Sequence, residues 1–435
     1  MSSMSDHLFD LVIRNVRIEE DGALVDIAVR DGLIAAIEQS FSCDAVTSFD
    51  GKGNFAFGGF VDTHVHLDKA CILDRCSICE GTLTEAVRET ARAKPGFTEE
   101  DVYERAARVV EKAIAHGTVR MRTFVEIDPR AGFRCLEAIK RIRADYAFAI
   151  DIEICAFAQD GLTNEPETLV MLDAALAGGA DLIGGCPYTD PDPEGHIARI
   201  FELAVKHDVA VDFHLDFSLD PNRTDLPAVI AATKLRGWQG RVSIGHVTNL
   251  SALPEASVIE IAKNLSEEGI ALTVLPATDL FLNGRGQDHL VPRGVAPAHI
   301  LAAHGVVTSV ATNNVLNPFT PYGDASLIRM ANLYANVAQL SRDADIAQVF
   351  DMVGVSAARQ LGVPYGLAVG NEATIILIDA AGPKAALREI GRIVAGWKGG
   401  RQSFHNGDPQ VHKPHRQCDY PNQAITCMTK LSDPV

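Results

Sequence analysis

Apolar and polar positions follow two different periods along most of the chain. From residue 58 onward, eight apolar segments with the character of strands alternate with amphipathic segments of helical period. The eight strand-like segments are GFVDTHVHL (59–67), TVRMRTFVEID (118–128), AIDIEICAFAQ (149–159), DLIGGCPYT (181–189), VAVDFHLDF (209–217), RVSIGHVTN (241–249), IALTVLPATD (270–279) and VVTSVATNNV (306–315). Eight consecutive strand–helix units predict an α/β fold, a parallel (β/α)8 TIM barrel, over residues 58–363.

The clearest helical segment lies between the first two of these strands. Thr98 is the expected N-cap, because acidic residues follow it in the first turn. Apolar residues then form one stripe at helical spacing, made of Val102, Ala106, Val109, Ala113 and Ile114. Gly117 is expected to end this helix.

The two ends of the chain have a different pattern. Residues 1–57 contain short β-prone runs separated by turns at Gly22, Gly32 and Gly51, which predicts a small antiparallel sheet. Near the other end, GLAVGNEATIILIDA (366–380) returns to strand character and is expected to complete that sheet. We therefore predict a β-sandwich domain built from residues 1–57 and 364–435, with a polar tail from about residue 403 that lacks regular structure.

Composition narrows the classes of partner. The chain has 435 residues, is 47% hydrophobic and 22% charged, and carries a net charge of −18, which argues against nucleic-acid and anionic-membrane partners. No apolar run is long enough to span a bilayer, and the N-terminus lacks the features of a signal peptide. Nine scattered cysteines favour a reducing cytoplasm over a disulfide framework. Whether the protein forms a homo-oligomer is left open.

Polar residues gather where the predicted strands end, which is where (β/α)8 barrels place their active sites. Residues i and i+2 of a strand share a face, so His64 and His66 are expected to project together, as are His214 and Asp216. The other polar residues at strand ends are Gln159, His246, Asp279, Asn313 and Asn314. Histidines from three strands are therefore expected at the same rim of the barrel. Single histidines placed by chance on the surface or in the core would not share one position in this way.

These histidines predict a metal centre. His64, His66 and His214 offer three neutral imidazoles, which suit one divalent ion, Zn or Fe, with a position open for water. His246 would lie beside that water, to orient hydroxide or carry a proton. The fourth strand has no lysine to bridge a second ion, which favours a single metal. Asp68 and Lys69 are expected to form an ion pair near the rim.

At this point the chain resembles the amidohydrolase superfamily, and within it the cytosine deaminase-like branch. The motifs that carry the resemblance are GFVDTHVHLDK, EICAFAQDG, LIGGCPY, DFHLDF, SIGHVTNLSALP and NNVLNPFTPYG, in the family's order. The resemblance implies a barrel with a β-sandwich and hydrolysis of a C–N bond in a small nitrogen heterocycle. It also implies that Gln159 reads the amide edge of the substrate, that His64, His66 and His214 hold the metal, and that His246 lies beside the hydroxide.

Two positions depart from the cytosine deaminase pattern. The glutamate expected three residues after the metal histidine of the fifth strand is Phe217, and the aspartate expected on the eighth strand is Asn313. Asn313 cannot act as a base, although its amide oxygen can contact a cation or the substrate. A related branch, similar to isopropylammelide aminohydrolase, places the proton shuttle where Asp216 stands. Asp216 is therefore a candidate base, and a carboxylate that only orients an imidazole is the alternative.

Three functions follow as hypotheses. The leading one is a metal-dependent aminohydrolase or deaminase of a nitrogen heterocycle. The second is a hydrolase of cyclic or linear amides, which would use the same centre. The third is a non-catalytic binding protein on a decayed barrel, suggested by the missing glutamate and aspartate and opposed by the intact histidines.

Overall fold

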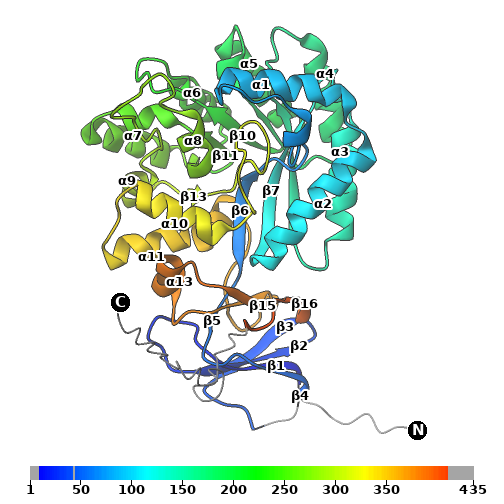
Figure 1. The fold of residues 1–435 in the computed structure, drawn as a ribbon, viewed down its shortest axis with the longest axis vertical. Helices are drawn as coiled ribbons and strands as arrows, with labels where there is room; N and C mark the ends of the chain where they lie inside the picture. Colours follow the sequence, from blue (N-terminus) through cyan, green and yellow to red (C-terminus); the bar gives the residue numbers. More distant parts are fainter. Residues whose placement is uncertain (1–8, 43–44, 410–435) are drawn as a thin grey trace, which may run out of the picture.

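A computed structural model of the protein describes residues 9–42 and 45–409. Its main body is an eight-stranded parallel sheet in the order β13-β12-β11-β10-β9-β8-β7-β6 (Figure 1). The strands are β6 (Phe60–Val65), β7 (Thr118–Glu126), β8 (Asp151–Ala158), β9 (Leu182–Gly185), β10 (Ala210–Leu215), β11 (Val242–His246), β12 (Ala271–Val274) and β13 (Thr308–Val310). The predicted eight-stranded parallel sheet is confirmed, and its strands follow one another in chain order.

Helices surround this sheet, as the alternating pattern predicts. They are α1 (Leu83–Ala93), α2 (Glu99–Ala115), α3 (Arg134–Asp145), α4 (Pro166–Ala177), α5 (Pro193–His207), α6 (Leu226–Arg236), α7 (Glu255–Glu267), α8 (Pro276–Leu282), α9 (Ala298–Ala303), α10 (Leu327–Val337), α11 (Asp343–Asp351), α12 (Val355–Gln360) and α13 (Pro383–Glu389). Helix α2 begins as predicted, because the Thr98 side chain accepts a hydrogen bond from the amide of Asp101. Within the described residues, no helix has both the length and the apolar character needed to cross a membrane.

The barrel closes where the first and last of its strands meet. Beyond the end of β13, Asn313 pairs with Val65 as an isolated parallel bridge. The amide of His66 donates to the carbonyl of Asn313, and the amide of Asn313 donates to the carbonyl of His64, both at 2.8 Å. The buried Asp62 carboxylate accepts from the amides of Thr312 and His64 at 3.2 and 3.3 Å. The seam thus sets the histidines beside Asn313.

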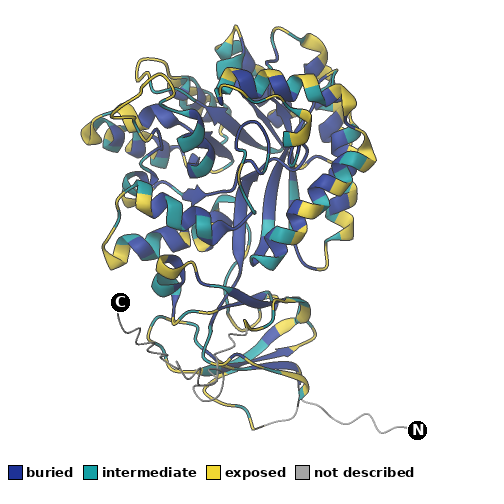
Figure 2. Ribbon diagram, viewed as in Figure 1, coloured by how far each residue is buried: buried dark blue, intermediate teal, exposed yellow. Residues whose placement is uncertain are grey.

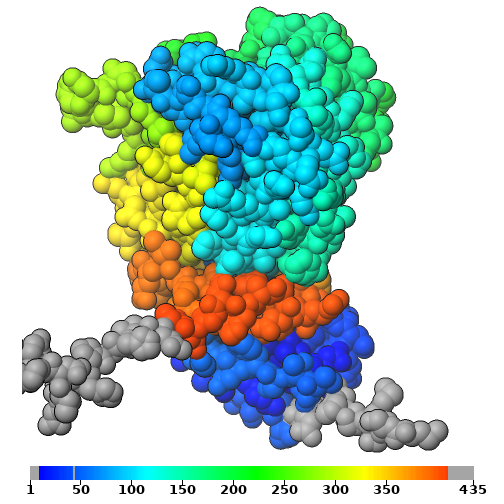
Figure 3. Space-filling view, turned by 45° about the vertical axis from the view of Figure 1, so that its right-hand side comes forward, coloured from blue at the N-terminus to red at the C-terminus, as the bar shows by residue number. Residues whose placement is uncertain are grey.

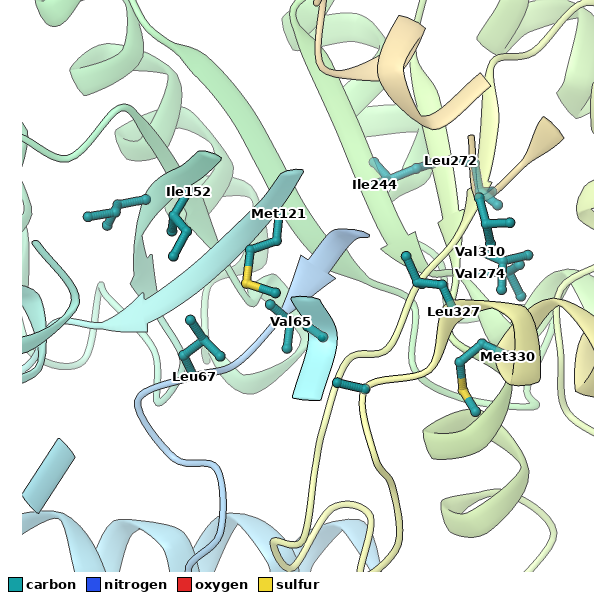
Figure 4. Close-up of a cluster of buried hydrophobic side chains, with 14 of the residues drawn as sticks. Val65, Leu67, Met121, Ile152, Ile244, Leu272, Val274, Val310, Leu327 and Met330 are labelled. Carbon is teal, nitrogen blue, oxygen red and sulfur yellow. The ribbon is translucent and has the colours of Figure 1, made fainter. Parts of the chain in front are cut away.

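A continuous apolar layer joins the strands to the surrounding helices. The strands are buried along nearly their whole length, whereas the helices alternate buried and exposed faces (Figure 2). Figure 4 shows part of this layer, in which Val65, Met121 and Ile244 from three strands belong to the same cluster as Leu327 and Met330 of α10. Burial of this apolar surface is the main favourable contribution to folding.

Two four-stranded sheets make up the rest of the described chain. The first has the order β3-β2-β1-β4, from β1 (Phe9–Val16), β2 (Val25–Arg30), β3 (Leu33–Glu38) and β4 (Ala45–Asp50). The second has the order β16-β15-β14-β5, from β5 (Phe55–Phe57), β14 (Ile375–Ile378), β15 (Ile393–Lys398) and β16 (Arg401–His405). The prediction of a purely antiparallel N-terminal sheet is wrong for one pair, since β1 and β4 run parallel. The predicted unstructured tail begins too early, because β16 extends to His405, and residues 410–435 lie outside the described residues.

The second of these sheets lies between the first sheet and the barrel (Figures 1 and 3). Strand β14 shows why, because it is apolar on both faces. Ile376 and Ile378 belong to the barrel's apolar cluster, whereas Ile375 and Leu377 pack in a second cluster with residues of β1 and β2. The two small sheets therefore share one core, and their description as a single β-sandwich remains a prediction.

The barrel interior also holds a buried ion-pair cluster. The Arg122 guanidinium on β7 lies 2.8 Å from the Asp212 carboxylate on β10 and 2.6 Å from the Glu153 carboxylate on β8. Burial raises the pKa of Asp212 to about 6, although the attraction of Arg122 opposes this shift. Because Asp212 is fully buried, its charge depends on this one guanidinium.

We expect Arg122→Met to lower the free energy of unfolding by about 3–5 kcal/mol, because it leaves a buried carboxylate without its partner. The matched control is Arg120→Met on the same strand. Arg120 pairs with Asp151, but both side chains are about one-third exposed, so the expected loss is below about 1 kcal/mol. Urea unfolding followed by circular dichroism measures both, and equal losses would contradict the argument.

Candidate active site

Three histidines converge at the end of the barrel where the strands terminate. The Nε2 atom of His214 lies 3.1 Å from Nε2 of His64 and 2.9 Å from Nε2 of His66. His64 and His66 lie on or directly after β6 and His214 lies on β10, and all three are buried. Among the described residues, they form the group whose ligand atoms lie close enough together to hold a metal ion. The structure therefore brings together the three predicted ligands.

The surroundings explain why these rings converge. Glycine at position 245 leaves room for the His64 ring, because a Cβ atom there would lie 3.0 Å from its Cε1. Phe124 and Phe157 pack from inside the barrel, with ring centroids 4.1 Å from His64 and 4.2 Å from His214 respectively. These apolar neighbours exclude water from the sides of the cluster.

The chemistry of the three rings fits a divalent cation. Burial lowers the pKa of His64, His66 and His214 well below the usual value, and the positive charge of Lys69 also contributes. The rings are therefore neutral, as metal ligands must be. Three neutral imidazoles whose Nε2 atoms face one point cannot all be satisfied by hydrogen bonds to one another, whereas a cation at about 2.0–2.1 Å from each satisfies all three.

His246 lies at the edge of the same cluster and is held by Asp279. The Nδ1 atom of His246 lies 2.6 Å from Oδ1 of Asp279, and both side chains are buried. Burial raises the pKa of Asp279, and the interaction with His246 opposes the rise. Asp279 was expected at the end of the seventh strand, but it lies in α8, where its other oxygen also accepts from the amide of Leu275. The pair directs Nε2 of His246 away from Asp279.

Asn313 lines the cavity and has no side-chain partner. Both its Oδ1 and its Nδ2 are buried and form no hydrogen bond. Its backbone is held at the barrel seam, so the side chain lies close to the histidines without support from any described residue. An unpartnered buried amide next to a cavity indicates a position for a ligand atom.

Gln159 follows β8 and also lines the cavity. Its Oε1 accepts a hydrogen bond from Nζ of Lys69 at 3.0 Å, and its Nε2 lies 3.6 Å from the sulfur of Cys186. Lys69 also donates to Glu126 at 2.6 Å, so its expected ion pair with Asp68 is wrong. Asp68 instead accepts from the backbone amides of Lys69 and Glu126, both at 2.8 Å.

Asp216 comes directly after β10 and has a different environment from His214. Its carboxylate accepts hydrogen bonds from the Thr224 hydroxyl, from the amide of Asp225 at 2.8 Å and from the Asn249 side chain at 3.2 Å. Its φ of 50° ends the strand geometry at this residue, so the side chain does not follow the alternation that would place it beside His214. Asp216 does not line the cavity.

The cavity lined by these residues is small, with a volume of about 10 Å³. Its polar lining consists of His66, Lys69, Gln159, Tyr188, His214, His246, Thr278, Asn313 and Asn314. Apolar side chains complete the wall, namely Leu83, Phe217, Leu282 and Phe319. The sequence pattern did not predict that Tyr188 and Phe319 line the cavity, and it placed Lys69 at the rim. These positions depend on how the loops after different strands fold over the barrel end, which residue spacing within one segment does not show.

The sequence of residues 55–402 matches the amidohydrolase family, and the chain belongs to that family. It is 25% identical over 403 residues to N-isopropylammelide isopropyl amidohydrolase of Pseudomonas sp. (strain ADP), covering 90% of this chain and 96% of that relative. It is 27% identical over 362 residues to pterin deaminase of Rhizobium rhizogenes (strain K84), covering 82% of each. The crystal structure of 5-methylcytosine deaminase from Klebsiella pneumoniae superimposes with a TM-score of 0.88 at 25% identity, covering 93% of this chain and 99% of that one.

We expect His66→Ala and His214→Ala each to abolish stoichiometric binding of zinc or iron, because two remaining imidazoles bind a divalent ion far more weakly than three. Elemental analysis by mass spectrometry after dialysis measures the bound metal. The matched control is His207→Ala, since His207 pairs with Asp173 on the barrel exterior and lies away from the cluster. Full metal occupancy in His66→Ala would show that the ligand assignment is wrong.

Proposed function

We propose that this protein is a mononuclear metal-dependent hydrolase that cleaves a C–N bond of a small nitrogen heterocycle and releases ammonia or an amine. The observation that carries the proposal is the convergence of the His64, His66 and His214 Nε2 atoms beside a cavity that His66 and His214 line. The relatives support it, because an isopropyl amidohydrolase, a pterin deaminase and a 5-methylcytosine deaminase are all named for such rings. We further propose zinc or iron as the ion and the cytoplasm as the compartment.

The three histidines are the proposed metal ligands. A divalent ion bound there would lower the pKa of a water to near neutrality and so supply hydroxide for attack on the ring carbon. Phe217 and Phe319 contribute flat apolar surface to the cavity wall, which suits a planar ring. Gln159 and Asn313 are the proposed substrate-binding residues, since both present amide groups to the cavity.

His246 is the proposed proton carrier. The Asp279 carboxylate accepts the Nδ1 proton of His246, so Nε2 is the ring nitrogen left for proton transfer on the side of the cavity. When His246 takes a proton at Nε2, the buried Asp279 carboxylate stabilises the positive charge that forms. The proton can then be given to the departing amine, so one residue serves as base and then as acid.

The base role of Asp216 remains a prediction. Among the described residues, the hydrogen-bond partners of its carboxylate include no imidazole, which speaks against the alternative that it orients one, and we propose instead that Asp216 supports the loop. Three donors already occupy its carboxylate, two of them from residues 224–225. Thr248 also donates to the Asp216 carbonyl at 3.4 Å, which ties the loops after β10 and β11 together. By holding these loops together, Asp216 positions the neighbouring Phe217, which lines the cavity.

Amide hydrolysis remains the second function, since the same centre would serve it. A panel of aminopyrimidines, aminotriazines, pterins and cyclic and linear amides, assayed with metal-loaded protein for ammonia or amine release, separates the two. Turnover of the amino-substituted rings is the expected result. Turnover of amides alone would favour the second function, and stoichiometric metal binding without any turnover would favour a binding protein.

We expect His246→Asn to lower kcat by about 10²–10⁴-fold, the range for loss of one general acid–base group. Bound metal should stay stoichiometric, because His246 is not among the three converging ligands. Steady-state kinetics with parallel elemental analysis measures both. Unchanged kcat would remove His246 from proton transfer.

Asp216→Asn tests the two roles of that carboxylate. An asparagine can accept through only one oxygen, so we expect a loss of about 1–3 kcal/mol in the free energy of unfolding from the unpaired donors. We also expect a smaller fall in kcat than in His246→Asn. A fall of about 10²-fold or more without any loss of stability would instead establish Asp216 as the base.

A further inference from the structure

Three amide side chains line the cavity, and in two of them, Gln159 and Asn314, the side-chain oxygen already accepts a hydrogen bond from the protein. In Gln159, Oε1 accepts from Nζ of Lys69 at 3.0 Å. An ammonium group can only donate, so this contact fixes which end of the Gln159 amide faces Lys69. The Nε2 group is left for the cavity, with one long contact of 3.6 Å to the sulfur of Cys186.

Asn314 is fixed in the same way by a chain of donors. Oδ1 of Asn317 accepts from the backbone amides of Phe319 and Thr320 at 3.0 and 3.1 Å. Backbone amides can only donate, so the Asn317 side chain must present its Nδ2 to Asn314, where it donates to Oδ1 at 2.7 Å. The Nδ2 group of Asn314 is then left for the cavity, with one long contact of 3.5 Å to the Thr278 hydroxyl.

Lys69 is itself held so that it cannot turn away from Gln159. Its ammonium donates to Glu126 at 2.6 Å and lies 4.4 Å from the centre of the Phe319 ring. Glu126 also pairs with Lys94 at 2.5 Å, and Lys94 pairs with Asp128 and Asp160. Of this charged cluster, Lys69 lines the cavity, whereas Lys94 and the three acidic residues do not.

Among the described residues that line the cavity, none is an aspartate or a glutamate. Beside Asn313, whose amide oxygen and nitrogen are both unpartnered, the cavity wall offers a lysine cation and two amides fixed as donors, on loops after β8 and after β13. A neutral ring with N–H groups at its edges would meet donors with donors at both places. A ring with acceptors at both places would be matched.

We infer that the cavity selects an oxo-substituted nitrogen heterocycle bound as its ring anion, with the negative charge spread over the ring and its oxo groups, and that Lys69 is a positioning residue for this selection. The inference rests on the proposed function for the reaction, but its physical content is the donor arrangement alone. A ring anion fits better than a substituent carboxylate, because the two donors come from different loops and a ring anion presents acceptors at separate edges.

The test is binding of three probes, measured by isothermal titration calorimetry at neutral pH with metal-free and metal-loaded protein. Barbiturate is a ring anion with oxo groups, uracil is a neutral ring of the same size, and orotate carries its charge on a substituent carboxylate. We expect barbiturate to bind at least about tenfold more tightly than uracil and orotate in both forms of the protein, the scale for hydrogen bonds to a charged group.

Three variants test the residues responsible. Gln159→Glu and Asn314→Asp keep the accepting oxygen but replace the amide donor by a carboxylate oxygen, so each should weaken barbiturate binding by about tenfold or more and change uracil binding less. Asn336→Asp, which adds the same charge at an exposed position on α10, is the matched control and should change neither. Lys69→Met combined with Glu126→Gln removes both charges of the buried pair and should reduce the preference for barbiturate.

The outcomes separate this inference from the proposed function. The inference would be overturned by equal binding of barbiturate and uracil or by tighter binding of orotate. A preference for barbiturate seen only in metal-loaded protein would also overturn it, because the charge of the ion would then explain the preference. Failure to bind metal or to hydrolyse any ring would overturn the proposed function and leave the binding result standing. If one variant does not fold, as judged by circular dichroism, the other isosteric variant and the wild-type preference still decide.

Discussion

The pairing of His64 and His66 with Asn313 across the barrel seam is the constraint on which the site depends. Strand β13 has only three residues, so the two backbone hydrogen bonds beyond its end complete the contact between the first and last strands. The same bonds fix the backbone of two proposed metal ligands and of the amide beside them. The hydrogen bonds that close the barrel therefore also position the site residues.

Buried charge is the second organising feature. Lys69, Glu126 and Lys94 are each only about 2% exposed, and isolated charges at such positions would cost several kcal/mol each. Each has more than one partner, which offsets that cost, and burial raises the pKa of the adjacent Asp68 to about 6 despite the favourable charge of Lys69. Such a cluster is weak evidence for stability. Its structural consequence is that Gln159 has one orientation.

The sequence predicted those parts of the fold that follow from local periodicity. Eight apolar runs became eight parallel strands, and the two-residue spacing of His64 and His66 placed both rings in the site. It could not predict the Lys69–Glu126 pair, whose members lie 57 residues apart, or the position of Asp279 in α8, since both depend on how loops fold over the rim. For Asp216 the alternation rule failed because the strand ends at Leu215.

Four residues at the rim of the site have a left-handed backbone conformation. Asp216, His246, Val247 and Asn313 all have positive φ, at 50°, 71°, 47° and 62°, and each comes at or just beyond the end of a barrel strand. The left-handed conformation costs roughly 1–2 kcal/mol for a residue with a side chain, less for aspartate and asparagine, and a branched Val247 is the least tolerant of it. An extended backbone at His246 would place its side chain in the strand's alternation and change the direction in which its ring now meets Asp279. The strained turns therefore give the rim side chains directions that regular strands cannot, and the packed barrel beneath them supplies the stability that keeps those turns in place.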